Sequence, residues 1–174
     1  MTAGPGPDLL DGARSALPGE RELLRRASGL ALRMSCPESL WPVLPGEPVR
    51  VFGGTADQVR AVRQFVGQQL AGHPDAVVVA SELATNSVVH SATGRPGGLF
   101  LVYAALAGDR QAAMIVTDQG GPFGLGRTAA GQDGESGRGL AVVRSLTSLF
   151  RICGHTSGHR SFIAVITTGP GGLR

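Results

Sequence analysis

The sequence predicts an α+β fold, a two-layer sandwich in which a mostly antiparallel sheet carries helices on one face. Apolar residues recur at helical spacing in two neighbouring segments, residues 59–70 and 75–91. Two apolar extended runs, residues 99–106 and 112–117, are separated by a short Gly-containing turn. Such turns favour antiparallel pairing, because parallel strands need a long crossover. The 174 residues, 42% of them hydrophobic, suffice for one compact domain with a core.

The first part of the chain differs in composition from the rest. Residues 1–48 are rich in Pro and Gly, so we expect a loosely ordered arm with at most a short helix at residues 20–26. Met34 offers an alternative translation start that would remove most of this arm. The regular domain is expected at residues 49–168, followed by a tail at residues 169–174.

The regular domain is expected to open with a strand at residues 49–52. Thr55 and Gln58 have the spacing of a capping box, which predicts that the first helix begins there. The other expected elements are a second helix at about 75–91, a hairpin of strands 99–106 and 112–117, a Gly-rich loop at 120–137, a third helix at 139–149, and a closing hairpin of strands 149–153 and 161–167.

Composition excludes several classes of function. All sixteen basic residues are Arg, which rules out lysine chemistry and is typical of a GC-rich coding bias. The arginines are scattered, so we expect no direct nucleic-acid partner despite the net charge of +3. Cys36 and Cys153 are too far apart for metal-ligand spacing and give no disulfide framework. With no leader and no long apolar run, a cytoplasmic protein without a membrane partner is expected.

The first cluster of residues that could bind a ligand or catalyse a reaction is on the second expected helix. Glu82 and Asn86 are four residues apart, so their side chains lie on one helix face. An isolated pair of this kind is more often a partly exposed polar stripe. In a functional site, Asn86 would supply an oxygen ligand for Mg²⁺ and Glu82 would orient or deprotonate a hydroxyl. His90 continues the face, where a helix-end role is the simpler interpretation.

The second cluster follows an apolar strand. Asp118 ends that strand, and Gly120 and Gly121 come directly after it. The Asp could simply cap a turn, as Asp-x-Gly commonly does. A carboxylate at the bottom of an apolar slot could instead accept a hydrogen bond from an exocyclic amine and so select adenine. The two glycines would let the backbone approach a ligand closely.

The third cluster begins the third expected helix. It comprises Ser136, Gly137, Arg138, Gly139 and Leu140. Glycines at a helix N-terminus expose unpaired amides to an anion such as phosphate. This signal is weak by itself in a chain with 27 glycines, and neither a lysine-containing phosphate loop nor a dinucleotide fingerprint is present.

In this order the three clusters resemble the Bergerat fold, the histidine kinase-like ATP-binding fold of gyrase, histidine kinases and MutL. The segment from Glu82 to Asn86 resembles its N box, and the clusters at Asp118 and Gly137 resemble its two glycine boxes. The chain is most similar to the anti-sigma factor serine/threonine kinases of the SpoIIAB and RsbW type, especially stand-alone actinobacterial proteins. The resemblance covers residues 49–167.

The resemblance implies an ATP and Mg²⁺ site with assigned roles. Asp118 would bind the adenine amine, Asn86 would coordinate Mg²⁺, and Glu82 would be the general base. Residues 121–137 would form the ATP lid, and Ser161 would contact adenine through water. The remaining implied nucleotide-binding residues are Gly120, Gly121, Ser136, Gly137, Arg138, Gly139 and Leu140.

The implied activity is transfer of the ATP γ-phosphate to a Ser or Thr of a STAS-type anti-sigma antagonist, which would control a sigma factor by partner switching. A homodimer is common among such relatives. The alternative is a catalytically inactive module that binds a sigma factor or STAS protein and uses nucleotide only to set its shape. Retention of Glu82 favours the kinase. The catalytic half of a histidine kinase is a weaker alternative, because no dimerisation helix with a phosphoacceptor His is evident.

Overall fold

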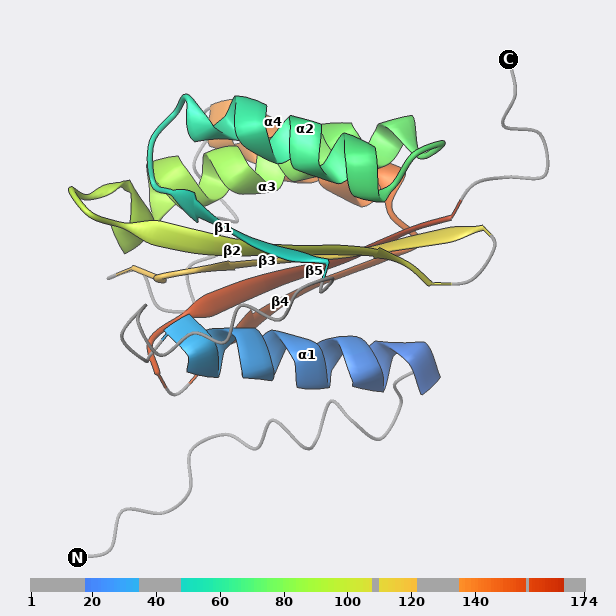
Figure 1. The fold of residues 1–174 in the computed structure, drawn as a ribbon, viewed down its shortest axis with the longest axis horizontal. Coiled ribbons are helices and arrows are strands. Elements are labelled where there is room, and N and C mark those ends of the chain that lie inside the picture. The colour runs from blue at the N-terminus through green and yellow to red at the C-terminus, as the bar shows by residue number, and fades with distance from the viewer. Residues whose placement is uncertain (1–17, 35–47, 108–109, 122–134, 156, 168–174) are drawn as a thin grey trace, which may run out of the picture.

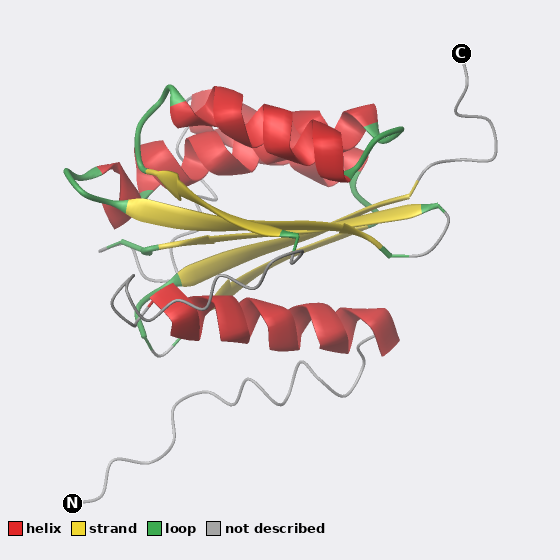
Figure 2. Ribbon diagram, viewed as in Figure 1, coloured by secondary structure: helices red, strands yellow, loops and turns green. Residues whose placement is uncertain are grey.

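The computed structural model describes residues 18–34, 48–107, 110–121, 135–155 and 157–167. One sheet lies between two helical layers (Figures 1 and 2). The helices are α1 (Pro18–Met34), α2 (Gln58–Gln69), α3 (Pro74–His90), the short 3₁₀ helix η3 (Ala92–Gly94) and α4 (Glu135–Leu146). The strands are β1 (Val49–Gly53), β2 (Leu99–Leu106), β3 (Gln111–Asp118), β4 (Leu149–Gly154) and β5 (Arg160–Thr167).

The five described strands form one sheet in the order β1-β2-β3-β5-β4, and every neighbouring pair is antiparallel. Both predicted hairpins are confirmed, β2 with β3 and β4 with β5. Strand β5 lies between β3 and β4, so the chain passes from β3 through α4 to the sheet edge before β5 returns to the centre. This return places Arg160, the first residue of β5, directly opposite Asp118, the last residue of β3.

The main core lies between the sheet and the layer of α2, α3 and α4. Alternate residues of the central strands, including Phe100, Met114 and Phe162, are buried against helical residues such as Val66 and Leu83. Each fully buried side chain of this size contributes about 1.5–3 kcal/mol relative to exposure. Burial on this scale fixes α3 over the middle of the sheet, where its polar face meets the ends of β3 and β5.

The opposite face of the sheet is also covered, by helix α1 (Figure 1). Leu23, Ala27 and Leu30 of α1 are buried against the other set of alternating strand residues: Leu101, Tyr103, Ala113, Ile115, Ile163 and Val165. The α+β class and antiparallel sheet are therefore as predicted, but helices cover both faces rather than one. The strands carry apolar residues at nearly every position, which is typical of a sheet buried on both sides.

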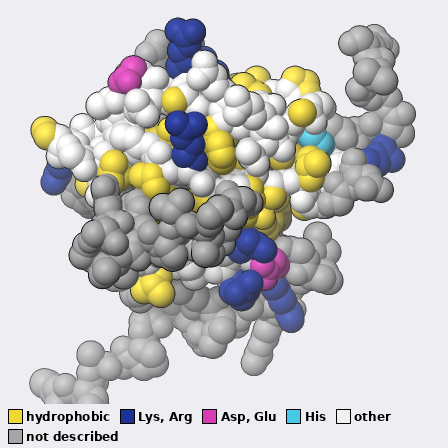
Figure 3. Space-filling view, viewed as in Figure 1, with side chains coloured by type: hydrophobic (Ala, Val, Ile, Leu, Met, Phe, Trp, Pro, Cys, Tyr) yellow, Lys and Arg dark blue, Asp and Glu magenta, His cyan; other side chains and the backbone are white. Residues whose placement is uncertain are grey.

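Helix α1 also corrects the expected loose order of residues 1–48. Residues 18–34 form a helix of 17 residues, longer than the short segment expected at 20–26. The outer side of α1 is charged, because Glu22 pairs with Arg25 and Arg26. Figure 3 shows basic side chains around an acidic one on this side of the molecule. The rest of the expected arm lies outside the described residues, apart from Pro48.

Helix boundaries differ from the predicted ones at two N-termini. Helix α2 begins at Gln58 rather than Thr55, and its N-cap Asp57 makes no side-chain capping bond. Gln58 instead donates its backbone amide to the Thr55 carbonyl, so the expected capping box is a turn before the helix. Helix α4 begins at Glu135, four residues before the predicted start. No helix among the described residues has the length and apolar character that a membrane crossing requires.

We expect the contact between α1 and the sheet to contribute measurably to stability. Leu30→Ala should lower the free energy of unfolding by about 2–4 kcal/mol, because the Leu30 side chain packs against the sheet and is only 5% exposed. Leu32→Ala is the matched control on the same helix: Leu32 is 68% exposed, so its loss should stay below about 0.5 kcal/mol. Urea unfolding of both variants measures this, and equal losses would contradict the docking of α1.

Candidate functional site

The candidate site lies where the C-terminal half of α3 crosses the ends of β3 and β5. Helix α3 begins with Pro74 and Asp75, which suit a helix N-terminus. Along its length Glu82 is half-buried, Asn86 is buried and His90 is exposed. Burial along the expected common face is therefore greatest at Asn86, in its middle, and lowest at His90. No group of His, Cys, Asp and Glu among the described residues is arranged to hold a metal ion.

Glu82 lies directly against α4. A Cβ atom added to Gly139 would collide with the Glu82 carboxylate, so the glycine permits this close approach. Gly139 is thus inside α4 rather than at its start. The free backbone amides predicted at the start of this helix belong instead to its first turn, which contains Ser136, Gly137 and Arg138.

Leu140, the last residue of the third cluster, is partly buried and packs against the main core. Arg138 is exposed. Residues 122–134, which make up most of the expected ATP lid and include Arg127, lie outside the described residues.

The Asn86 side chain has an unsatisfied polar group. Its Nδ2 atom is buried and has no hydrogen-bond partner among the described residues. Buried amide nitrogens nearly always donate a hydrogen bond, and an acceptor such as a phosphate oxygen would satisfy Nδ2. The amide would be able to supply one oxygen to a hard cation such as Mg²⁺, which usually takes few protein ligands and completes its shell with phosphate and water.

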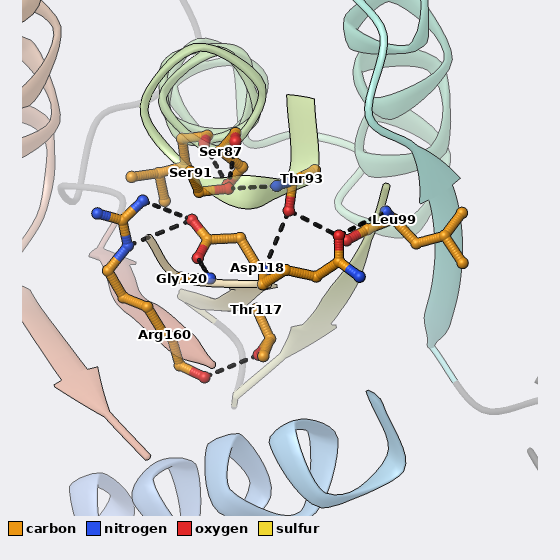
Figure 4. Close-up of polar contacts among 11 residues, drawn as sticks. Ser87, Ser91, Thr93, Leu99, Thr117, Asp118, Gly120 and Arg160 are labelled. Carbon is orange, nitrogen blue, oxygen red and sulfur yellow. Dashed lines mark hydrogen bonds and ion pairs between the residues drawn. The ribbon is translucent and has the colours of Figure 1, made fainter. Parts of the chain in front are cut away.

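Asp118 is the most deeply buried charged group of the site, with no solvent exposure. Its Oδ1 accepts a hydrogen bond from the Gly120 amide at 2.8 Å (Figure 4). Its Oδ2 accepts from Arg160, at 2.6 Å from Nη2 and 3.2 Å from Nε. Burial raises the pKa of Asp118, and the guanidinium of Arg160 opposes that rise, as do the Gly120 amide and the Ser87 hydroxyl.

Gly120 has the backbone conformation that the expected close approach requires. Its φ is +62°, in the left-handed region, and a Cβ there would collide with the carbonyl of Gly158. The Gly120 carbonyl in turn accepts the amide of Ala92 at 2.5 Å. Asp118 therefore caps the turn after β3 by accepting the Gly120 amide. The group that comes close to Gly120 is the Gly158 carbonyl, which belongs to the same chain. Gly121 is exposed, beside the last residues of α3.

A network of hydroxyl and amide groups fixes the end of β3 to the start of β2. Thr93 Oγ1 donates to the Leu99 carbonyl at 3.1 Å and accepts the Gln119 amide at 3.0 Å. Gln119 Oε1 accepts the Leu99 amide at 3.2 Å, and Ser91 Oγ accepts the Thr93 amide at 3.0 Å. Because Ser91 ends α3, this network ties the helix to the strand that carries Asp118 (Figure 4).

Ser161 lies on the opposite face of the sheet from Asp118. Side chains alternate along a strand, so Ser161 projects with Ile163 and Val165 toward α1, while Arg160 projects toward α3. The Ser161 hydroxyl is buried and lies 2.8 Å from both Thr117 Oγ1 and His155 Nε2. Figure 4 shows Thr117 pointing toward α1 and away from the Asp118 carboxylate. The expected water-mediated contact of Ser161 with adenine is therefore not supported by its position.

Two features of the site were missed by sequence reasoning. Arg160 stands next to the predicted Ser161, but only the pairing register of β3 with β5 reveals that it faces Asp118. Thr93 and Gln119 carry no motif of their own, and their bonds join segments 26 residues apart.

The comparisons with known proteins address the same region. Residues 52–161 match the model of the histidine kinase-like ATPase domain family. The chain belongs to the histidine kinase-like ATPase domain family. The matched segment of this ATPase domain begins in β1, ends in β5 and contains Glu82, Asn86 and Asp118. No curated protein matches the chain.

Among solved structures, the ATPase domain is similar to the RsbU and RsbW domains of Rv1364c from Mycobacterium tuberculosis. The TM-score is 0.48 at 24% sequence identity, and the alignment covers 69% of this chain and 32% of that chain. The chain thus spans about a third of that structure's length.

We expect Gly120→Ala to destabilise the ATPase domain by more than about 2 kcal/mol, because strain at φ +62° adds to the collision with Gly158. Gly72→Ala is the control: Gly72 has φ +89° but no atom within 4 Å of an added Cβ, so strain alone should cost about 1 kcal/mol. Denaturant unfolding of both variants measures the difference. Equal losses would show that the Gly120–Gly158 approach is unimportant for stability.

Proposed function

We propose that the protein is an ATP-binding regulatory serine/threonine kinase of the anti-sigma factor type. Its expected substrate is a Ser or Thr of a STAS-type antagonist, through which it would control a sigma factor by partner switching. The observation that carries the proposal is the packing of Glu82 against Gly139. This contact places a carboxylate beside the first turns of α4, whose free amides favour phosphate.

The positions of Asp118, Asn86 and the first turn of α4 are compatible with the proposed roles, whereas Ser161 lies on the other face of the sheet and is given no role here. Asp118 lies at the buried end of the site and would accept the adenine amine. Asn86 would coordinate Mg²⁺ through Oδ1, its unpartnered Nδ2 would donate to a phosphate oxygen, and the cation would neutralise phosphate charge. Ser136, Gly137 and Arg138 would bind the phosphates at the start of α4.

The proposed chemistry requires little covalent participation by the protein. The oxygen of the partner's hydroxyl attacks the γ-phosphorus, the bond from that phosphorus to the β–γ bridging oxygen breaks, and ADP leaves. Glu82 accepts the hydroxyl proton as the new ester forms. Glu82 is half-buried, so part of the residue is open to such a partner.

The second candidate function is a nucleotide-dependent binding module without kinase activity. The ion pair between Asp118 and Arg160 favours it, because the carboxylate proposed to read the base already has a strong partner. In that case the protein would bind its sigma factor or STAS partner, and nucleotide would at most change its shape.

Calorimetric titration with ATP and Mg²⁺ tests the nucleotide site. Asp118→Asn should weaken binding at least about tenfold, because it removes the charge that accepts the base amine. Asn86→Ala should make the remaining affinity insensitive to Mg²⁺. The control, Thr85→Ala, changes an exposed residue on the same helix and should leave binding unchanged. Undetectable binding by folded wild-type protein would contradict the ATP site.

Transfer of labelled γ-phosphate to purified STAS-domain proteins separates the two functions. We expect labelling of a Ser or Thr that Glu82→Gln reduces at least about a hundredfold, the size of a typical general-base effect, while ATP affinity stays within about twofold. Complex formation with a STAS protein or sigma factor without any transfer would favour the binding module.

A further inference from the structure

The Asp118 carboxylate leaves little room for a further donor. A carboxylate has about four lone-pair positions. The Gly120 amide uses one on Oδ1, and Arg160 uses Oδ2 through both Nη2 and Nε. The single hydrogen of the Ser87 hydroxyl can be given either to the Leu83 carbonyl, at 3.0 Å, or to the carboxylate. An adenine amine that approached Oδ2 would therefore have to replace Arg160.

Arg160 is the partner that can be replaced. The Gly120 amide is fixed by its backbone turn, whereas Arg160 reaches Asp118 with a long side chain that is 23% exposed. The guanidinium also lies over the Phe162 ring, 4.7 Å from the centroid, so it is held at the sheet from two sides. Its exposed part gives it a route toward solvent without movement of the strand.

We propose that Arg160 competes with the base amine of the nucleotide for Asp118 and thereby sets the affinity of the site. This inference rests on the proposed ATP-binding function. In the nucleotide-free protein Arg160 supplies the opposite charge to the buried carboxylate. When nucleotide binds, the amine takes over Oδ2 and the guanidinium turns away. Part of the binding free energy is spent on breaking the ion pair, and the affinity is lowered accordingly.

The groups facing this pair are few among the described residues. His159 precedes Arg160, and its charge interaction with Asp118 is weaker than the effect of its own burial, which lowers the pKa of the imidazole. No second acid pairs with Arg160 in the part of the chain described. The competition therefore involves one cation and one carboxylate.

The test replaces Arg160 and measures the affinity for ATP with Mg²⁺ by calorimetry. Arg160→Ser removes the competing charge, and Arg160→Gln retains a hydrogen-bond donor that supports the fold. We expect both variants to bind ATP about tenfold more tightly than wild type. Arg144→Ser is the matched control, since Arg144 also lies over a phenylalanine ring, that of Phe150 at 5.8 Å, but among the described residues Asp118 forms its ion pair with Arg160 and not with Arg144. Its affinity should equal that of wild type.

A second measurement follows Arg160 in the wild-type protein and does not depend on the stability of a variant. The ¹⁵N resonance of Arg160 Nε, assigned by its loss in Arg160→Gln, should shift as ATP is added. Unchanged or weaker affinity in the Arg160 variants, or an Nε resonance that stays fixed at saturating ATP, would overturn the competition.

These outcomes separate the inference from the function on which it rests. If wild type binds ATP and Asp118→Asn abolishes binding, but Arg160 variants gain nothing, only the competition is wrong. If neither wild type nor Arg160→Ser binds, both the competition and the proposed nucleotide site are wrong. Binding by Arg160→Ser alone would support the competition and would favour the binding module as the function of the wild-type protein.

Discussion

The buried carboxylate of Asp118 is the constraint on which the candidate site depends. A charge with no exposure is costly unless it is paired and hydrogen-bonded. Its partners come from the turn after β3, from the start of β5 and from α3. These three segments are far apart in the sequence and must meet at one point. The site geometry is thus a consequence of satisfying one charge, with or without a ligand.

The hydrogen-bond network of Thr93, Gln119 and Leu99 also fixes the segment that carries Asp118. It holds the turn after Asp118 against the start of β2, through bonds that use both the backbone and the side chain of Gln119. Because Ser91 connects this network to the end of α3, a displacement of the helix would also displace the turn after β3. The adenine end of the proposed site is therefore fixed by short, local contacts.

Sequence reasoning was most successful where local pattern decides structure. Apolar periodicity gave α2 and α3, and the short turns gave both hairpins. It was less successful where a result depends on contacts distant in sequence. The position of Ser161 follows from strand alternation relative to Asp118, and Arg160 becomes visible only through the β3–β5 register. Helix α1 was underestimated because the surrounding Pro and Gly masked its apolar stripe of Leu23, Ala27 and Leu30.

The physical roles of the glycines in the motifs became clear only in the structure. Gly139 looked like part of a phosphate-binding helix start, yet it lies inside α4 and gives space to Glu82. Gly120 looked like a site of ligand approach, yet the neighbouring hairpin approaches it first. A glycine motif indicates that another group approaches the backbone closely, but the packing in the structure is needed to identify that group.

Coverage of the sheet by α1 restricts how another protein can reach the domain. With helices over both faces, most described residues of β2, β3 and β5 are buried and are not available to a second chain. Among the described elements, backbone donors and acceptors remain unpaired by a neighbouring strand only along the outer margins of β1 and β4. A regulatory partner would therefore recognise helix surfaces, loops or these two margins. Recognition at β4 would meet the domain close to the hairpin that carries Arg160.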